Sequence, residues 1–265
     1  MKICRMMFYS DYISDEQLIK AVQNSSHLDK CYIGLYEKNW NGTKQNNINT
    51  KLLYNLNENT EIVYITDEIL GISGKEPPNI IETYCRNYIL EKSKQNKYDF
   101  LIVQDTDEFL ISKDYQFMLN EYIPTMIQQG YDSCAIRLKN FWKNWKTILV
   151  NEKEVIENWP GEWATFGLVL NSTVRFTNIR DHTFENKCGV QQESFLFHGS
   201  FVHDDDNLLQ KINTWGHSKD IDFKKWYQEK WLDWTPETTD LHPSTRPEIW
   251  KQAVPYDGPL PKECY

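Results

Sequence analysis

The sequence predicts an α/β fold in which helices cover a mixed central sheet. Over residues 2–103, apolar segments of strand length alternate with amphipathic segments of helix length, as in sheets covered on both faces. The run 100–103, Phe-Leu-Ile-Val, is apolar without interruption, which is typical of a central parallel strand. After residue 110 the strand-like segments are longer, which indicates mixed or antiparallel pairing in the second half.

The first half is expected to run strand, helix, strand, strand, helix, strand. The corresponding ranges are 2–8, 14–24, 31–36, 61–65, 79–95 and 100–103, with a polar loop over 38–50. The first helix starts with a capping box, because Ser14 can accept a backbone hydrogen bond and Gln17 stands three residues on. The second helix is expected to have one apolar face, on which five residues fall at helical spacing: Ile81, Tyr84, Cys85, Tyr88 and Ile89.

The second half is expected to contain three strands and three helices. The predicted strands are 133–139, 165–176 and 194–203, and the predicted helices are about 115–128, 206–217 and 222–233. The proline-rich tail, 235–265, is expected to run extended over the surface.

Composition excludes several classes of protein. A net charge of −9 and a pI near 5.2 argue against broad binding of duplex DNA or anionic membranes. The six cysteines form no C-x-x-C pair, so neither a zinc knuckle nor a disulfide scaffold is expected. No signal peptide and no membrane span are expected, and the predicted compartment is the cytoplasm, or the host cytoplasm for a viral protein.

Three carboxylates, Asp105, Asp107 and Glu108, directly follow the apolar run 100–103. Like charges this close repel each other unless a cation lies among them. In open α/β sheets, ligands bind beyond the carboxyl ends of the strands. Asp105 and Asp107 can turn toward one ion, and oxygen ligands suit Mg²⁺ or Mn²⁺, with Mg²⁺ typically sharing its shell with substrate phosphates.

This arrangement resembles the GT-A glycosyltransferases, in which a Rossmann-like N-terminal half binds a nucleotide-sugar and a D-x-D motif ends its last strand. The stretch 85–110, CRNYILEKSKQNKYDFLIVQDTDEFL, looks like the family-2 pattern, where an Arg-Asn pair on a helix precedes the D-x-D. Arg86 and Asn87 fill those places. The resemblance implies that Arg86 lies near the nucleotide, that Asp107 binds the metal directly, and that Asp105 acts through water or holds the ribose.

A second segment, 197–220, strengthens the resemblance. Its sequence, FHGSFVHDDDNLLQKINTWGHSKD, is similar to one in family 17, the N-acetylglucosaminyltransferases that add a bisecting residue, and in related bacterial and viral proteins. It departs from that pattern at Phe197, where the pattern has Trp, and at Thr214 and Gly216 near its end. Many GT-A enzymes complete the metal shell with a His from this half, and imidazole is a reasonable ligand for Mn²⁺. The resemblance therefore implies His198 as a ligand, with His203 and His217 as second choices.

The implied reaction moves a sugar from a UDP- or GDP-sugar to an acceptor hydroxyl, with inversion as in family-2-like members. Inversion requires a general base. The sequence offers three carboxylates for this role, Glu162, Asp181 and Glu193.

Nucleobase contacts are expected at the ends of the first two strands, by analogy of position. Tyr9 and Asp11 follow the first strand and Glu37 follows the second. Tyr9 can stack on uracil or guanine, and Asp11 or Glu37 can accept a hydrogen bond from a base N–H.

A single domain is expected, with a nucleotide-sugar-binding half (1–110), an acceptor and metal-completing half (111–234) and the tail (235–265). Two other functions stay open: a nucleotide-sugar or glycan-binding homologue without turnover, and a metal-dependent phosphohydrolase, since haloacid-dehalogenase-type enzymes also place D-x-D after an apolar strand. The acceptor also stays open among a glycan, a protein side chain, a lipid and a hydroxymethylated base of viral DNA.

Overall fold

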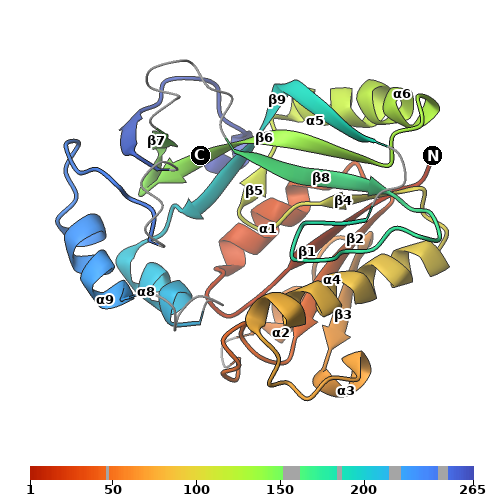
Figure 1. Cartoon of the computed structure of the whole chain (residues 1–265), viewed down its shortest axis with the longest axis horizontal. Helices are drawn as coiled ribbons and strands as arrows, with labels where there is room; N and C mark the ends of the chain where they lie inside the picture. The colour runs from red at the N-terminus through yellow and green to blue at the C-terminus, as the bar shows by residue number, and fades with distance from the viewer. Residues whose placement is uncertain (46–47, 152–161, 184–186, 215–221, 244–249) are drawn as a thin grey trace.

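One ten-stranded mixed sheet organises the chain in the computed structural model, which describes residues 1–45, 48–151, 162–183, 187–214, 222–243 and 250–265 (Figure 1). The main strand order is β10-β7-β6-β8-β4-β1-β2-β3, while β9 pairs with both β5 and β6. The predicted α/β fold with a mixed central sheet is therefore confirmed.

The N-terminal half is a parallel sheet with helices on both faces. Its strands are β1 (Ile3–Phe8), β2 (Lys30–Tyr36), β3 (Thr60–Ile65) and β4 (Phe100–Val103). Its helices are α1 (Asp15–Asn24), α2 (Thr50–Tyr54), α3 (Asp67–Leu70) and α4 (Pro78–Gln95). Ser14 caps α1 as predicted, because its Oγ accepts a hydrogen bond from the Gln17 backbone N–H at 3.1 Å. The short helices α2 and α3 were not predicted.

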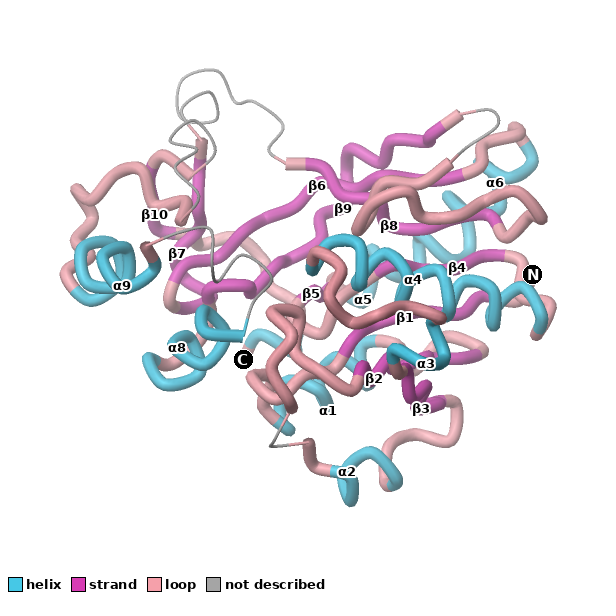
Figure 2. Tube along the Cα trace, turned by 60° about the horizontal axis from the view of Figure 1, so that its bottom comes forward, coloured by secondary structure: helices cyan, strands magenta, loops and turns pink. Residues whose placement is uncertain are grey.

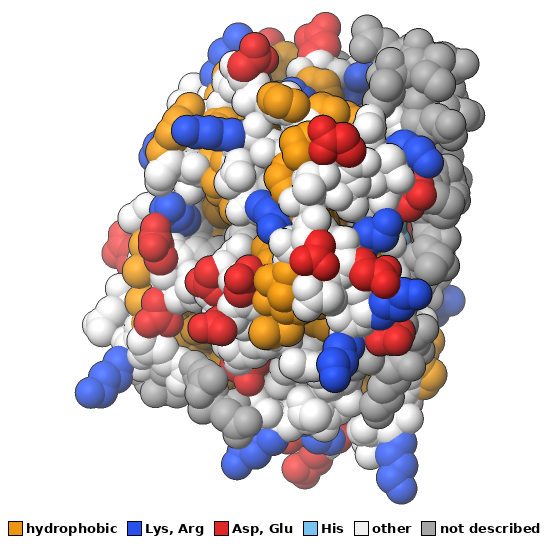
Figure 3. All heavy atoms as spheres, turned by 90° about the vertical axis from the view of Figure 1, so that its left-hand side faces the viewer, with side chains coloured by type: hydrophobic (Ala, Val, Ile, Leu, Met, Phe, Trp, Pro, Cys, Tyr) orange, Lys and Arg blue, Asp and Glu red, His pale blue; other side chains and the backbone are white. Residues whose placement is uncertain are grey.

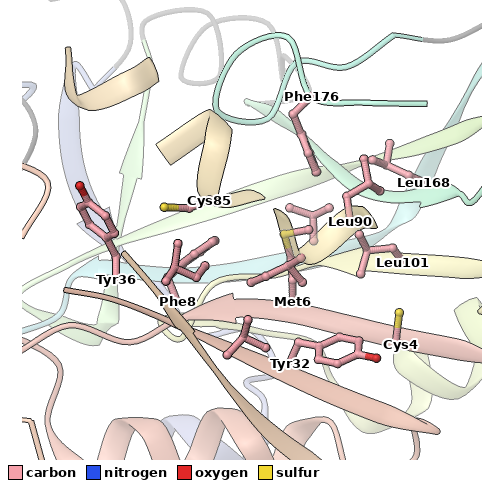
Figure 4. Packing of buried hydrophobic residues seen from close by; sticks show 14 of the residues in the cluster. Cys4, Met6, Phe8, Tyr32, Tyr36, Cys85, Leu90, Leu101, Leu168 and Phe176 are labelled. Atoms are coloured by element: carbon pink, nitrogen blue, oxygen red, sulfur yellow. The ribbon is translucent and has the colours of Figure 1, made fainter. Parts of the chain in front are cut away.

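Opposite faces of β1 pack against different helices. Met6 and Phe8 pack with Cys85 and Leu90 of α4, in the cluster shown in Figure 4. Met7, one position along the strand, packs against the α1 side. Because alternate residues of a strand face opposite sides of the sheet, these two helices cover both faces, and β1 is buried along its whole length.

The second half adds antiparallel pairing. Its strands are β5 (Glu108–Phe109), β6 (Ser133–Trp142), β7 (Asn144–Val150), β8 (Trp163–Val169), β9 (Cys188–Phe201) and β10 (Gln252–Pro255). The sheet changes from parallel to antiparallel where β8 joins β4. Figure 2 shows β10 beside β7, at the end of the sheet remote from β3.

Helices of the second half lie between and after these strands. They are α5 (Ser112–Phe117), the π-helix η1 (Met118–Tyr122), α6 (Ile123–Gln128), α8 (Asp205–Thr214), α9 (Phe223–Trp226), the π-helix η2 (Tyr227–Leu232) and the 3-10 helix η3 (Lys262–Cys264). None of the helices in the described ranges has the length and apolar character needed to cross a membrane.

Several predicted features differ from the structure. Tyr84 and Tyr88, expected on the apolar face of the second helix, are 45% and 38% exposed. The strand expected at 194–203 runs over 188–201. The strand expected at 165–176 ends at Val169, because the Asn171 side chain accepts hydrogen bonds from the backbone N–H groups of Thr173 and Val174 and forms a turn. Strand β7 was not predicted, and the tail expected to be merely extended contributes β10. The described part of the helix expected at 206–217 ends at Thr214, since 215–221 lie outside the described residues.

Acidic and basic side chains are interspersed over the face shown in Figure 3, with small apolar patches between them. The described part of that face carries no continuous basic strip of the kind that tracks duplex phosphates. On this face, the attraction of a charged ligand would therefore come from a few neighbouring side chains and not from the face as a whole.

Candidate active site

The loop that carries Asp105 and Asp107 is fixed by a buried arginine. Arg5 of β1 is fully buried, and it donates from Nε to the Gln104 carbonyl at 3.2 Å and from Nη2 to the Asp105 carbonyl at 2.9 Å. The Gln104 side chain then donates to the Glu108 carbonyl at 2.6 Å. Because these partners lie within the core, the loop backbone is held in one conformation.

Arginines supply the cations that the carboxylates of Asp105 and Glu108 require. Arg86 of α4 places Nη2 3.2 Å from Asp105 Oδ1. Arg180, in the loop after β8, places Nη2 2.8 Å from Asp105 Oδ2 and 2.6 Å from Glu108 Oε2. Burial alone would raise the pKa of Asp105, but Arg86 and Arg180 outweigh it and hold that pKa well below its ordinary value.

Helix α4 also positions the loop that bears Arg180. The Asn87 side chain donates to the Phe176 carbonyl at 2.9 Å and accepts from the Phe176 N–H at 2.8 Å. Arg86 thus contacts Asp105, while its neighbour Asn87 holds the loop that carries Arg180.

Asp107 faces a lysine and a histidine. The Lys211 Nζ of α8 lies 3.4 Å from Asp107 Oδ2, and it also donates to the carbonyl and hydroxyl of Ser200 at 2.7 and 2.8 Å. His198 Nε2 lies 3.8 Å from Asp107 Oδ1. Burial would raise the pKa of Asp107, but Lys211 and His198 reverse this and lower it.

Strand β9 brings His198 to the carboxylates. His198 pairs with Glu108 of β5 on one side and with Asn140 of β6 on the other. The next residue, Gly199, donates its N–H to the Asp107 carbonyl at 2.8 Å. A Cβ at this position would stand 2.6 Å from the Trp145 ring, so glycine leaves room for Trp145 of β7 to pack against β9.

These side chains line a cavity of about 260 Å³. Arg86, Asp105, Asp107, His198 and Lys211 form its polar wall, and Phe8, Tyr12 and Trp40 contribute aromatic surface. Trp40 stacks on Tyr36, with ring centroids 5.9 Å apart and an interplanar angle of 13°. Flat aromatic faces beside cationic side chains suit a nucleobase attached to phosphates.

A divalent cation fits the edge formed by Asp107 and His198. Their facing atoms are 3.8 Å apart, which leaves room for an ion bound to both, and carboxylate with imidazole is a common donor set for Mn²⁺. Among the described residues, no three His, Cys, Asp or Glu side chains converge as a complete metal site. Such an ion would take its remaining ligands from water and substrate oxygens, as Mg²⁺ sites often do.

The residues expected at the nucleobase lie outside the cavity wall. Tyr9 is buried, and its hydroxyl donates to Asp15 at 3.3 Å. The Asp11 carboxylate accepts from the Asn39 side chain at 3.5 Å, and Glu37 accepts from the Asp67 N–H at 2.8 Å.

None of the three general-base candidates lines the cavity either. Asp181 and Glu193 are exposed, and Glu162 contacts Asn140. Of the alternative histidine ligands, His203 lines a neighbouring cavity of about 200 Å³ that shares Asp107, and His217 lies outside the described residues.

The half-buried imidazole of His203 is expected to reduce the stability of the fold in acid. Burial lowers the pKa of His203 to about 3, and the Lys211 ammonium acts in the same direction. At pH values between about 3 and the ordinary imidazole pKa of about 6.5, this imidazole is protonated in the unfolded chain and neutral in the folded chain. The free energy of unfolding should therefore fall with decreasing pH by up to about 1.4 kcal/mol per unit in this window.

Urea denaturation at stepped pH measures this dependence, and His203→Gln is the test variant. The variant should lose the extra slope below the ordinary imidazole pKa. An unchanged slope in His203→Gln would contradict the prediction.

Comparisons with known proteins find only distant structural similarity. No family model matches the sequence, and no curated protein matches it. Similar solved structures include "S. aureus TarS 1-349" (TM-score 0.41, 10% identity, 88% of this chain and 78% of that chain) and a longer S. aureus TarS (0.43, 10%, 86% and 47%). A third is mannose-1-phosphate geranyltransferase from Thermus thermophilus (0.31, 8%, 65% and 51%). This chain spans about half the length of the longer TarS, and likenesses this low carry no functional conclusion.

Proposed function

We propose that the chain is a metal-dependent glycosyltransferase that moves a sugar from a UDP- or GDP-sugar to an acceptor hydroxyl. The observation that supports this proposal is the cavity beyond β1 and β4. It joins an aromatic surface to basic side chains and to the Asp107–His198 edge. In open α/β sheets this position is where nucleotides bind.

Each part of the cavity has a place in this reaction. Phe8, Tyr12 and Trp40 would stack on the base, while Arg86 and Lys211 would face the diphosphate. Asp107 and His198 would hold Mn²⁺ or Mg²⁺ together with diphosphate oxygens. When bound, such an ion neutralises the negative charge that grows on the departing diphosphate.

The chain's own cations contribute to the same end. Lys211 is held by Ser200 beside Asp107, and Arg86 is held by Glu82 through Nε at 3.0 Å and Nη2 at 2.7 Å. Because both groups are fixed before substrate arrives, they would stabilise a developing anion with little reorganisation.

A thermal-shift experiment tests the proposal. Ligand that binds only the folded chain stabilises it by RT ln(1 + [L]/Kd), about 2.7 kcal/mol when ligand is at 100 times Kd. UDP or GDP should therefore raise the melting temperature when Mn²⁺ or Mg²⁺ is present, and much less when EDTA removes the metal.

Other ligands serve as controls in this assay. Inorganic phosphate with metal should produce little shift. Equal responses to phosphate and to nucleotides would instead favour the phosphohydrolase, and a shift without turnover of any nucleotide-sugar would favour a binding protein.

A further inference from the structure

Glu162, Asn140 and His198 form a hydrogen-bonded chain, and the far side of His198 faces Asp107. The Asn140 Nδ2 lies 2.5 Å from Glu162 Oε2, and His198 Nδ1 lies 2.6 Å from Asn140 Oδ1. On its other side, His198 Nε2 lies 3.8 Å from Asp107 Oδ1. The main chain holds the first two members in place, since the Leu138 N–H donates to the Glu162 carbonyl at 2.8 Å.

The chemistry of these groups permits one arrangement of protons when Glu162 is ionised. A carboxylate only accepts, so Asn140 must turn its amino group toward Glu162. The Trp250 Nε1–H, which can only donate, approaches the same Glu162 oxygen at 3.5 Å and reinforces its role as acceptor. The Asn140 carbonyl oxygen then faces His198, so the imidazole must carry its proton on Nδ1.

This arrangement leaves the Nε2 lone pair of a neutral His198 pointing toward the Asp107 carboxylate. Two electron-rich atoms then face each other with no proton between them. A ligand histidine in a metal site is commonly oriented in this way, by a hydrogen bond from its other ring nitrogen.

We propose that Glu162 is a positioning residue that acts through Asn140 to fix His198 as the Nδ1–H tautomer, and so prepares His198 Nε2 and Asp107 to receive a divalent cation. The binding of a divalent cation by these two groups rests on the proposed function, whereas the tautomer of His198 does not. Glu162, one of the three carboxylates considered as general base, thus gains a different task. Its Oε2 contacts Asn140 and Trp250, and Glu162 does not line the cavity.

The decisive variant is Glu162→Gln, because the glutamine side chain has nearly the shape of glutamate and its amide group can donate a hydrogen bond. Glutamine can donate to Asn140, so the Asn140 amide is free to turn over and present its amino group to His198. Nitrogen-15 NMR of the full chain reads the imidazole tautomer directly, at a pH well above the ordinary imidazole pKa of about 6.5. His198→Gln identifies the His198 signals.

Wild-type His198 should show the Nδ1–H tautomer, and Glu162→Gln should shift population to the Nε2–H form. Glu193→Gln is the matched control, since Glu193 is an exposed carboxylate on the same strand as His198 and should leave the tautomer unchanged.

Binding of Mn²⁺ alone, followed by electron paramagnetic resonance of the free ion, gives a second measurement. Loss of a residue that orients a ligand typically weakens metal binding ~10–100-fold, and Glu162→Gln should fall in that range. In a His198→Gln background, Glu162→Gln should have no further effect, as expected when both residues act through one group.

The wild-type spectrum alone can overturn the inference, without any substitution, if His198 is found as the Nε2–H tautomer. An Nδ1–H tautomer that persists in Glu162→Gln would overturn it equally. If the tautomer responds as stated but Mn²⁺ does not bind, the Glu162–Asn140–His198 chain stands, and the metal-dependent part of the proposed function fails instead.

Discussion

Asp107→Asn should lower the rate of nucleotide-sugar turnover on the order of 10³-fold. The substitution removes the negative charge that faces His198 Nε2 at 3.8 Å and so weakens the proposed cation site. Release of UDP or GDP from the preferred nucleotide-sugar, at saturating Mn²⁺, measures the effect. The fold should survive, because Lys211 keeps its hydrogen bonds to the carbonyl and hydroxyl of Ser200.

Asp206→Asn is the matched control for this prediction. Asp206 is an exposed carboxylate in the first turn of α8, and it does not line the cavity. Its variant should turn over the donor at nearly the wild-type rate. Wild-type turnover by Asp107→Asn, at every metal concentration, would show that Asp107 does not hold the metal.

Arg180→Met should destabilise the fold by roughly 3–5 kcal/mol, the cost of removing one partner from a buried ion pair. Arg180 is the cation that touches both Asp105 and Glu108, and the Glu108 side chain is only 2% exposed. Without Arg180 a buried carboxylate loses its counter-charge beside a second carboxylate. Urea denaturation, with the midpoint and slope fitted together, measures the change in the free energy of unfolding.

Two further variants make the Arg180 prediction specific. Adding Glu108→Gln to Arg180→Met should recover much of the lost stability, because the uncompensated charge is then gone. Arg175→Met removes an exposed arginine from the same loop and should change stability by no more than about 0.5 kcal/mol. If Arg180→Met lowered the free energy of unfolding no more than Arg175→Met does, the ion pairs of Arg180 would contribute little to the stability of the fold.

Most of the parallel half could be predicted from sequence because its signals are local. The apolar run 100–103 and the capping box at Ser14 each depend on a few neighbouring residues. Strands β7 and β10 could not be found in this way. Their pairing joins Leu149 to Ala253 across about a hundred residues. The apolar run within β7, 148–150, is shorter than the four-residue run of β4, so it gives a weaker signal for a strand.

The candidate site was predicted in part. The resemblance to known motifs singled out Asp107 and His198, which the structure places side by side. Arg5, Arg180 and Trp40 were missed, because a single charged or aromatic residue in a strand or loop has no distinctive spacing. The three carboxylates were the available signal, since their repulsion requires cations nearby, and the structure shows that arginine and lysine side chains meet this need.

Strand β9 has a consequence for how the protein is made. It pairs with β6 along most of its length and reaches β5, so the site is assembled from segments far apart in sequence. Contacts of such long range slow folding, because the intervening chain must be ordered before they form. Before residue 188 has been synthesised, the edge of β6 that later pairs with β9 is exposed and can pair with another molecule. Aggregation is therefore more favoured during this interval of synthesis than after β9 has formed.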